Sequence, residues 1–363
     1  MIWLTWRQFR TQAIVAAVAL VAFAALLAAT GPHLASMFAA DGLDGCHGGG
    51  CANDADYFSG SVATSPYGAL WLLSQGIILL APAVIGLFWG APLIARELET
   101  GTAALAWNQS VTRVRWLAVK LAAGAVTAMA VAEAFSMMQS WWAAPISQAV
   151  ADGASIGVGS SRFSQLNFDT HGITPLGYAA FAFALGITAG ALIRRTVPAM
   201  AVTLAIFAAF QVAMPLWVRP NLAPPHHMVI PVTSLGSPAS QAGPGGDTFT
   251  LLAHDIPGQP GAWLLSSGPV NAAGQTVSTT PAACTSVGST GAKAAGPNTG
   301  VFGPHQGPAA FVACLAGHGI QEAVTYQPAS RYWRFQATET GIYLVLALAM
   351  AGYCFRRLRR RPS

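Results

Sequence analysis

Two long apolar runs are separated by residues 93–120, LIARELETGTAALAWNQSVTRVRWLAVK, a stretch that contains two carboxylates and a cluster of cations. Four small or apolar positions recur in it at steps of four, three and four: Ile94, Leu98, Gly101 and Leu105. This spacing places them on one side of a helix, and Glu97 and Glu99 lie in its first turns, where the helix dipole favours carboxylates. The stretch therefore predicts an amphipathic helix over residues 96–112 at a membrane surface, between two spans.

The composition predicts an integral membrane protein. Hydrophobic residues make up 53% of the 363 residues and charged residues only 9%, whereas about a quarter of the residues of a soluble domain are charged. The mean hydropathy is +0.49. The 38 glycines and 23 prolines indicate that a sizeable irregular portion lies outside the helices.

Six apolar runs predict six membrane spans, since roughly 20 helical residues cross a bilayer. They cover residues 13–30, 67–95, 116–142, 175–193, 197–218 and 340–355. Pro82 and Pro92 remove backbone donors from the second run, which predicts a kink there. The runs define a membrane domain over residues 1–218, which holds five spans, and a last span with a basic tail over residues 337–363.

The N-terminal residues MIWLTWRQFRTQ alternate aromatic and basic side chains. Aromatic residues favour the headgroup region and cations favour anionic lipid, so this segment predicts an amphipathic elbow helix lying in the membrane surface. A cleaved signal peptide is the alternative, because two arginines precede the first apolar run and small residues follow it.

Polar or irregular segments connect the spans. Residues 31–66 predict an external loop, and residues 143–171 a loop rich in glycine and serine. Residues 219–336 contain short apolar runs, TFTLLAHDI and GAWLLSSGPV, among many Pro, Gly, Ser and Thr residues, which predicts a loop-rich mixed or β external domain. The expected fold class is an all-α polytopic membrane protein that carries this extra domain between spans five and six.

The distribution of cations predicts the orientation in the membrane. If the N-terminus is cytoplasmic, 13 of the 18 Lys and Arg residues lie on cytoplasmic segments, including the tail arginines after residue 355. Cytoplasmic loops carry such an excess of positive charge. We therefore expect a multi-pass protein of a bacterial plasma membrane with both termini in the cytoplasm.

The five cysteines separate according to this topology. Cys46 and Cys51 share the first external loop, Cys284 and Cys314 share the large external domain, and Cys354 lies alone in the last span. The two external pairs predict two disulfides. Histidines near these cysteines offer metal binding as an alternative, but no zinc-type spacing accompanies them, so no metal site is expected.

Known catalytic motifs are absent from the sequence. It contains no GxxxxGK[ST] phosphate loop, no HExxH and no GxSxG, so no catalytic residue is assigned and the chain is not expected to be an enzyme. Glu133 falls midway through the third span, where an ionisable residue is a candidate for a functional polar site. The alternative is a packing role, in which it faces the bundle interior, either protonated or bonded to Gln75, Ser136 or Gln139.

The residues RELETGTAALAWNQSVTRVRWLAVK resemble the segment after the second span in permease subunits of type-two ATP-binding cassette exporters, particularly the six-span permeases of actinobacteria. The WRQFR elbow and the run YQPASRYWRFQATETGIYL before the last span are also similar to this group. In the family, this segment is the coupling region that meets the ATPase subunit. The positions that carry over are Arg96, Glu97, Glu99, Gly101, Thr102, Arg113 and Lys120.

The resemblance implies a permease that moves a small amphipathic or hydrophobic molecule outward. ATP and magnesium would be bound by a separate ATPase subunit, so this chain itself would hold no cofactor, and a second permease copy would complete a dimer. Nucleic acid is not an expected partner. Because residues 219–336 exceed the external loops of most members, a membrane-anchored sensor or assembly protein, whose external domain binds a ligand or an envelope component, remains the alternative.

Overall fold

The structure is a computed structural model that describes residues 2–46, 51–100, 113–152, 154, 161–234, 239–242, 249–252, 256–259, 261–284 and 308–359. The chain forms two compact units, Met1–Leu222 together with Trp333–Ser363, and Ala223–Tyr332. We call them the helical unit and the inserted unit, and each is described by itself.

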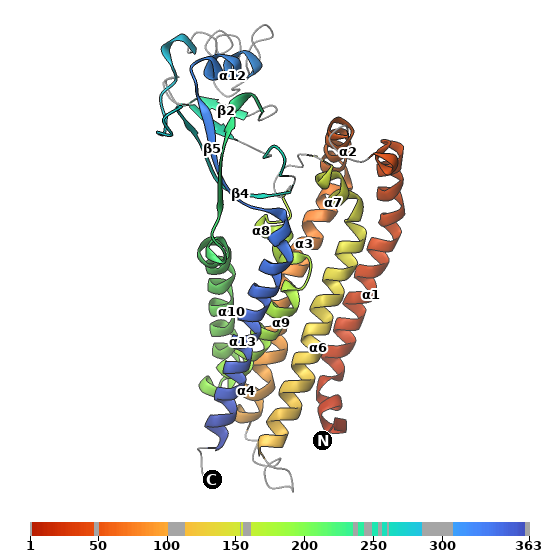
Figure 1. Ribbon diagram of the computed structural model, residues 1–363. Helices are drawn as coiled ribbons and strands as arrows, with labels where there is room; N and C mark the ends of the chain where they lie inside the picture. The colour runs from red at the N-terminus through yellow and green to blue at the C-terminus, as the bar shows by residue number, and fades with distance from the viewer. Residues whose placement is uncertain are drawn as a thin grey trace. The chain divides into compact units, whose positions relative to one another are not determined.

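Six helical segments within the described residues are long and apolar enough to cross a membrane, which confirms the predicted polytopic fold. They are Arg10–Ala40, Pro66–Glu99, Val114–Trp142, Thr174–Ile193, Thr196–Asn221 and Ala329–Arg357. The helices that form them are α1 (Ile2–Ala40), α3 (Pro66–Ile85) with α4 (Ala91–Glu99), α6 (Arg113–Trp142), α9 (Thr174–Ile193), α10 (Thr196–Ala213) and α13 (Tyr332–Arg359). Figure 1 shows them as one bundle, with both chain termini at the same end.

The second span changes its hydrogen bonding near the predicted prolines. A π-helical segment, η2 (Gly86–Gly90), joins α3 to α4. Pro92 has no N–H to donate to the carbonyl of Phe88, four residues earlier. Gln12 Nε2, from α1, donates to that carbonyl instead (3.1 Å). The proline pattern thus produces a local π segment whose released backbone group is satisfied by another span.

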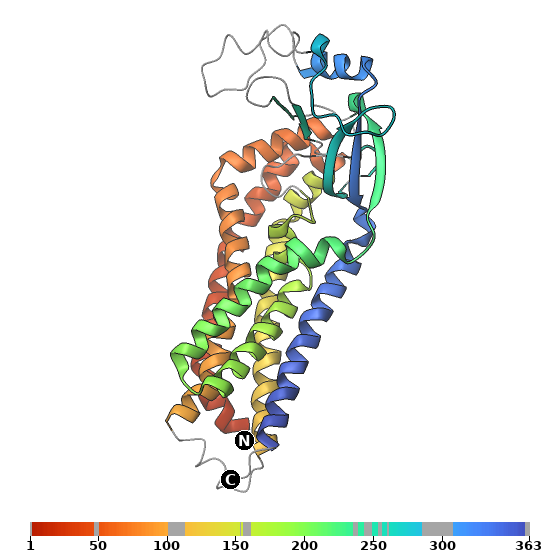
Figure 2. The same ribbon diagram turned by 90° about the vertical axis from the view of Figure 1, so that its left-hand side faces the viewer.

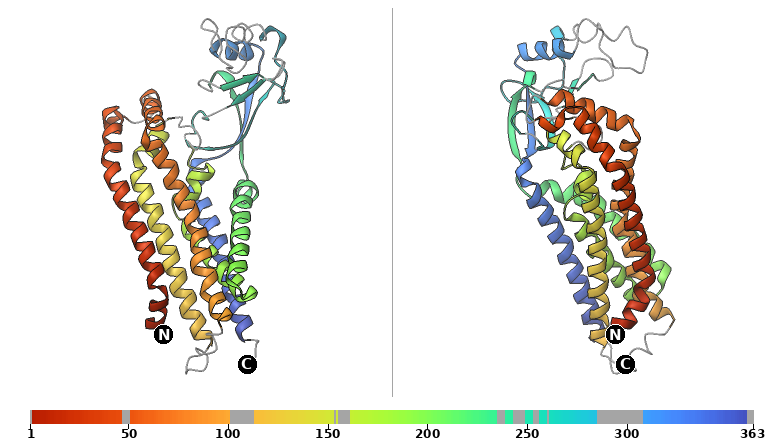
Figure 3. Two further views of the ribbon diagram at one scale, coloured as in Figure 1. Left: turned by 180° about the vertical axis from the view of Figure 1, so that it is seen from behind. Right: turned by 90° about the vertical axis from the view of Figure 1, so that its right-hand side faces the viewer.

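The helix α9 is the most buried of the spans, and glycines allow the second span to approach it closely. A Cβ atom on Gly90 would lie 2.6 Å from the Phe183 carbonyl, and a Cβ on Gly190 would lie 2.6 Å from the Ala91 carbonyl. Small residues permit such close contact between helix backbones in membranes. In Figure 2, α10 runs obliquely across α9, which it contacts, and α1 packs beside α6 (Figure 3).

Two expected segments differ from the structure. Residues 2–10 continue directly into the first span as one helix, α1, so no separate elbow helix is present. Residues 31–66, expected to be a loop, are mostly helical, because α1 extends to Ala40 and α2 covers Ala52–Thr64. Their apolar side chains, such as Phe38 and Phe58, are buried in one cluster, which stabilises helices that the polar composition of the segment obscured.

Shorter helices complete the helical unit. The 143–171 segment, expected to be a loop, contains α7 (Ala144–Ala151) and α8 (Gln165–Thr170). The remaining short segments of the chain are η1 (Leu43–Gly45), η3 (Met214–Val218), η4 (Arg219–Asn221), η5 (Val232–Ser234) and η6 (Ala329–Arg331).

The inserted unit contains a three-stranded antiparallel sheet of order β1–β5–β4, from β1 (His226–Pro231), β5 (Gln321–Gln327) and β4 (Trp263–Val270). A second antiparallel pair joins β2 (Ala239–Ala242) to β3 (Phe249–Leu252). Both β3 and β4 fall within the runs that predicted strands. The helix α12 (Pro308–Gly317) contributes Phe311 and Leu315 to the core of this unit.

Both pairs of cysteines that the sequence indicated are disulfide-bonded. Cys46 is joined to Cys51 next to α2, and Cys284 is joined to Cys314 in the core of the inserted unit. Cys354 is free and buried. Its Sγ lies 3.5 Å from the Thr188 hydroxyl of α9, which ties the last span to the central helix.

Candidate functional site

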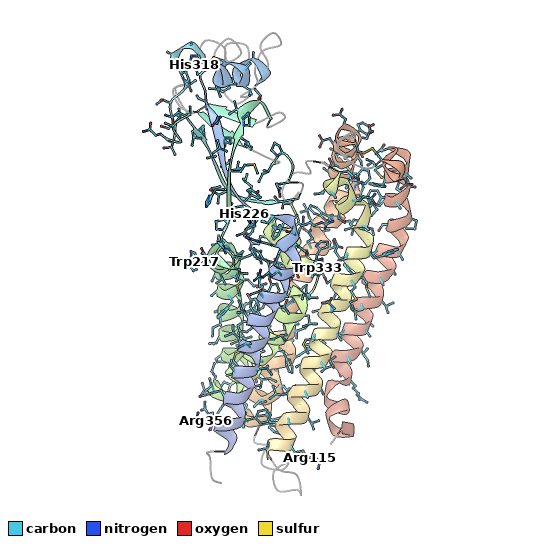
Figure 4. The ribbon with its side chains drawn as sticks, viewed as in Figure 1. Arg115, Trp217, His226, His318, Trp333 and Arg356 are labelled. Atoms are coloured by element: carbon cyan, nitrogen blue, oxygen red, sulfur yellow. A yellow bond between two sulfur atoms is a disulfide. The ribbon has the colours of Figure 1, made fainter. Side chains whose placement is uncertain are left out.

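The end of the bundle at which both termini lie carries exposed arginines. We call it the terminal end; it is marked by Arg115 and Arg356 in Figure 4, and Arg96 and Arg195 are also exposed there. Trp217 and Trp333, both exposed, mark the opposite end of the helical unit, the far end (Figure 4). Exposed aromatic side chains are common where spans meet a membrane–water interface, and an excess of cations marks one side of many membrane proteins.

A buried ion pair links the second span to the third at the terminal end. Lys120 Nζ on α6 pairs with Glu97 Oε1 at the end of α4. Only 3% of the lysine side chain and 17% of the glutamate side chain are exposed. The ammonium group also lies 4.6 Å from the ring of Trp116, one turn earlier, in a favourable cation–π position. Removing Glu97 would leave the Lys120 ammonium buried without its carboxylate, which is strongly unfavourable.

A second contact links the second span to the fifth. Glu99 Oε2 accepts hydrogen bonds from the Thr196 hydroxyl (2.7 Å) and from the Thr196 backbone N–H (3.2 Å). Thr196 is the first residue of α10, and the first N–H groups of a helix lack partners within it. Glu99 therefore caps a helix that begins 97 residues later in the sequence.

The sequence around Glu97 and Glu99 indicates neither contact, because the partners, Lys120 and Thr196, come from other spans. Both carboxylates thus hold the end of the second span in place within the chain itself.

The other residues of the expected coupling region are partly described. Arg96 is exposed in the last turn of α4, which continues the second span directly. Arg113 begins α6. Gly101 and Thr102, with the rest of the predicted 96–112 helix beyond residue 100, lie outside the described residues.

A second charged cluster, which sequence reasoning missed, is buried at the far end. Arg219 of η4 donates through Nε to Glu339 Oε2 (2.9 Å) and through a terminal nitrogen to Glu339 Oε1 (3.0 Å). The same terminal nitrogen pairs with Asp169 Oδ1 of α8. At most 2% of any of these three side chains is exposed.

Aromatic side chains surround this cluster. Tyr178 Oη, from α9, lies 2.6 Å from Glu339 Oε1 and 2.9 Å from Asp169 Oδ1. The ring of Phe168 lies 4.0 Å from the guanidinium carbon of Arg219. The sequence did contain a signal for this cluster. Arg219 directly follows the fifth apolar run, Asp169 and Glu339 precede the fourth and sixth runs, and all three positions fall on the same side of the predicted membrane.

Glu133 lies midway along α6 and is half-buried. Its Oε2 is buried without a hydrogen-bond partner among the described residues. The suggested partners bond elsewhere or not at all: Ser136 donates to the Gly172 carbonyl, Gln75 donates to Asn167, and neither amide atom of Gln139 has a partner in the described chain. The packing hydrogen bonds proposed for Glu133 are therefore not formed.

One group of potential metal ligands occurs among the described residues. Ligand atoms of Cys284, Cys314 and His318 lie within 4.8 Å of one another. Because the two sulfur atoms are bonded to each other, they are not available as thiolate ligands. The group is a disulfide with a neighbouring imidazole.

Comparison with known proteins gives one match. The family model described as "ABC-2 membrane transporter related" matches residues 17–219, more than half of the chain. The matched region contains five spans, both terminal-end contacts and Glu133. No curated protein and no solved structure matches the chain.

Proposed function

The chain belongs to the ABC-2 membrane transporter related family, and from this premise we propose that it is the permease of an exporter whose second span is driven by the ATPase. As a member, the chain is a multi-pass membrane permease subunit of an ATP-binding cassette transporter, and the ATPase is a separate subunit. Membership favours this function over the sensor or assembly protein that the sequence left open.

The observation that carries the coupling mechanism is the double attachment of the end of α4. Glu97 binds Lys120 on the third span, and Glu99 binds Thr196 on the fifth. A force applied to the segment that follows α4 therefore reaches three spans together. Movement passes between elements that are packed or bonded as rigid neighbours.

The ATPase contact is proposed at residues 96–113, which begin at the last turn of α4 and end at the first residue of α6. Arg96, Arg115 and Arg195 add positive charge around it, in keeping with a cytoplasmic position for this end and for both termini. ATP and magnesium would be bound by the ATPase subunit, and the permease would act as a dimer with a second permease copy in a bacterial plasma membrane.

The substrate is proposed to be a small amphipathic or hydrophobic molecule that moves outward. The half-buried carboxylate of Glu133 and the amide of Gln139, which has no hydrogen-bond partner among the described residues, support a polar position on α6 within the spans. A polar position inside an apolar bundle suits a molecule with both characters.

The test uses the permease expressed with its ATPase and reconstituted in lipid. Glu97→Gln and Lys120→Met each remove one charge of the buried pair with little change in size. We expect each to lower substrate transport per ATP hydrolysed by at least about tenfold, because the end of α4 loses its attachment to α6. In Glu97→Gln the buried Lys120 ammonium also loses its carboxylate, which costs about 3–5 kcal/mol. The exchange variant Glu97→Lys with Lys120→Glu restores the opposite charges and should recover much of the coupling.

Arg356→Gln is the matched control, since Arg356 is exposed at the same end but belongs to α13. It should leave the ratio of transport to hydrolysis unchanged. The coupling role is refuted if Glu97→Gln and Lys120→Met fold, bind the ATPase and transport with the normal ratio. Loss of ATPase binding in the Arg356 variant alone would move the contact to α13.

A further inference from the structure

The charged cluster at the far end holds more negative than positive charge. It contains two carboxylates, Asp169 and Glu339, and one guanidinium, Arg219. With both carboxylates ionised, a buried group almost inaccessible to water would have a net charge of −1. An unbalanced buried charge is strongly unfavourable, so the cluster is neutral only if it holds one further positive charge.

The hydroxyl of Tyr178 shows where a further hydrogen is required. Its oxygen lies within hydrogen-bond distance of one oxygen of each carboxyl group, 2.9 Å from Asp169 and 2.6 Å from Glu339. A phenol has one hydrogen to donate. If both carboxylates were ionised, one of these two contacts would join two oxygen atoms with no hydrogen between them. A hydrogen on one carboxyl group makes both contacts hydrogen bonds.

The contacts of Arg219 indicate which carboxyl group holds it. Glu339 receives two parallel hydrogen bonds from Arg219, one on each oxygen, the arrangement in which an ionised carboxylate is most strongly stabilised. Asp169 meets Arg219 through one oxygen only. Burial, with a further contribution from Glu339, raises the pKa of Asp169 to about 6 against the opposing effect of Arg219.

We propose that Asp169 is a proton-binding site in the packed arrangement of the far end, and that separation of α8, η4 and α13 releases this proton. In the packed arrangement, the Asp169 carboxyl donates to Tyr178 Oη, Tyr178 donates to Glu339 Oε1, and Glu339 remains ionised against Arg219. No covalent bond changes, and the proton passes to water when the cluster opens.

The position of the cluster in the chain gives the proton a consequence. Arg219 lies just before Ala223, where the inserted unit begins, and Glu339 lies just after Tyr332, where it ends. Both connections of the inserted unit are thus held to the α8–α9 region through one buried cluster. A displacement of either connection exposes Asp169 to water, where an aspartate has a pKa of about 3.9.

None of the other described polar groups that pack against the cluster supplies a second positive charge. Tyr343 on α13 packs its ring 4.8 Å from that of Tyr178 and donates to Gln211. His171 follows α8 and bonds to the Asn167 carbonyl. Burial, and the charge of Arg162, lower the pKa of His171, so its ring is neutral near pH 7. The Gln336 amide, which bonds to the backbone around residues 168–174, is neutral at every pH.

The sign of the pH dependence follows from these two pKa values. The packed form binds the proton more tightly than the open form, so its advantage is complete below about pH 4 and is lost as the pH rises through about 6. Two pH units correspond to at most a hundredfold change in the packed-to-open equilibrium. Opening of the far end is therefore favoured in neutral surroundings and opposed in acidic ones.

The first test is infrared spectroscopy of the full-length permease in lipid nanodiscs without its ATPase. Glu322, whose pKa burial raises to about 7, also contributes a carbonyl band, so Glu322→Gln is introduced into every sample. In this background we expect the band of protonated carboxyl groups at pH 5 to contain a component that disappears as the pH rises toward 7 and that is missing in Asp169→Asn. Asp54→Asn, at an exposed position on α2, is the matched control and should keep this component. An Asp169→Asn spectrum identical to that of the Asp54→Asn control overturns the proposal.

The second test compares thermal unfolding midpoints between pH 4.5 and 7.5. The amide of Asp169→Asn donates to Tyr178 as the protonated acid does, so this variant should retain the stability of the native protein at low pH and lose the part of its pH dependence that falls between pH 4 and 6. Tyr178→Phe should lower the midpoint most at acid pH, whereas Tyr343→Phe should leave the shape of the pH curve unchanged. If Asp169→Asn is instead destabilised equally at every pH, Asp169 is an ionised structural partner of Arg219 and the proton site is refuted.

Discussion

The close approach of the second span to α9 gives a direct prediction for Gly186→Ala. A Cβ atom at position 186 would contact the Gly86 carbonyl, would lie 2.7 Å from the Ala91 amide nitrogen and would lie 3.0 Å from the Gly90 carbonyl carbon. All three atoms belong to the backbone, so no side-chain rotation relieves the contact. The two helices must move apart.

The magnitude follows from two opposing effects. Overpacking a closely packed interface costs about 1–3 kcal/mol, and rigid backbone on the opposite side places Gly186→Ala near the upper end. Alanine favours a helix over glycine by about 1 kcal/mol. The net loss of unfolding free energy should be about 2 kcal/mol.

The assay is unfolding of the purified permease in mixed micelles, followed by circular dichroism. Gly76→Ala and Gly341→Ala are matched controls, because these glycines also lie in spans but no atom outside their own surroundings approaches within 4 Å of an added Cβ. They should be neutral or slightly stabilising. If Gly186→Ala unfolds at the same midpoint as Gly76→Ala, the backbone contact between these helices is wrong.

Two further predictions concern buried or half-buried carboxyl groups. Burial raises the pKa of Glu322 on β5 to about 7, against a weaker effect of Ser267, so the stability contributed by its protonated form is complete below about pH 4 and lost as the pH rises through 7. Glu322→Gln should therefore raise the free energy of the opening that allows hydrogen exchange in β5 by about 1–2 kcal/mol at pH 8 and change it little at pH 5. An equal effect at both pH values would contradict the raised pKa. Glu133→Gln should leave the amount of folded permease unchanged or raised, since its Oε2 has no partner among the described residues; transport at the normal rate would assign Glu133 to packing, and reduced transport with normal folding would assign it to the substrate path.

The local pattern of the sequence was sufficient to predict the spans. Each apolar run corresponds to a helix of membrane length, and the β3 and β4 strands lie within runs bounded by turn residues. Pattern also predicted the cysteine pairs, because the first external loop holds only Cys46 and Cys51 and the external domain holds only Cys284 and Cys314. The spans and strands follow from the pattern of neighbouring residues, and the cysteine pairs follow from dividing the chain into spans and external segments.

Tertiary partners were beyond the reach of the same reasoning. Nothing near Glu99 in the sequence indicates that its carboxylate caps the helix that begins at Thr196, and Arg219, Asp169 and Glu339 are separated by at least 50 residues from one another. The helices within residues 31–66 were missed because their polar residues hide an apolar stripe that becomes visible only against α1 and α6. Opposite charges at the ends of different spans on the same side of the membrane are the sequence feature that indicates such contacts.

The two charged sites lie at opposite ends of the helical unit, and α9 connects them. Near the terminal end, Gly190 packs against the backbone of α4 at Ala91 and Ala95, just before the carboxylates that hold α4 to its neighbours. Toward the far end, Tyr178 of the same helix is bonded to the Asp169 and Glu339 carboxyl groups. A helix transmits an axial displacement because its backbone hydrogen bonds keep its length, and the glycine contacts leave α4 and α9 no compressible side chains between them. A displacement of α4 is therefore expected to reach Tyr178, so ATPase action at one end and proton release at the other are predicted to be linked through a single helix.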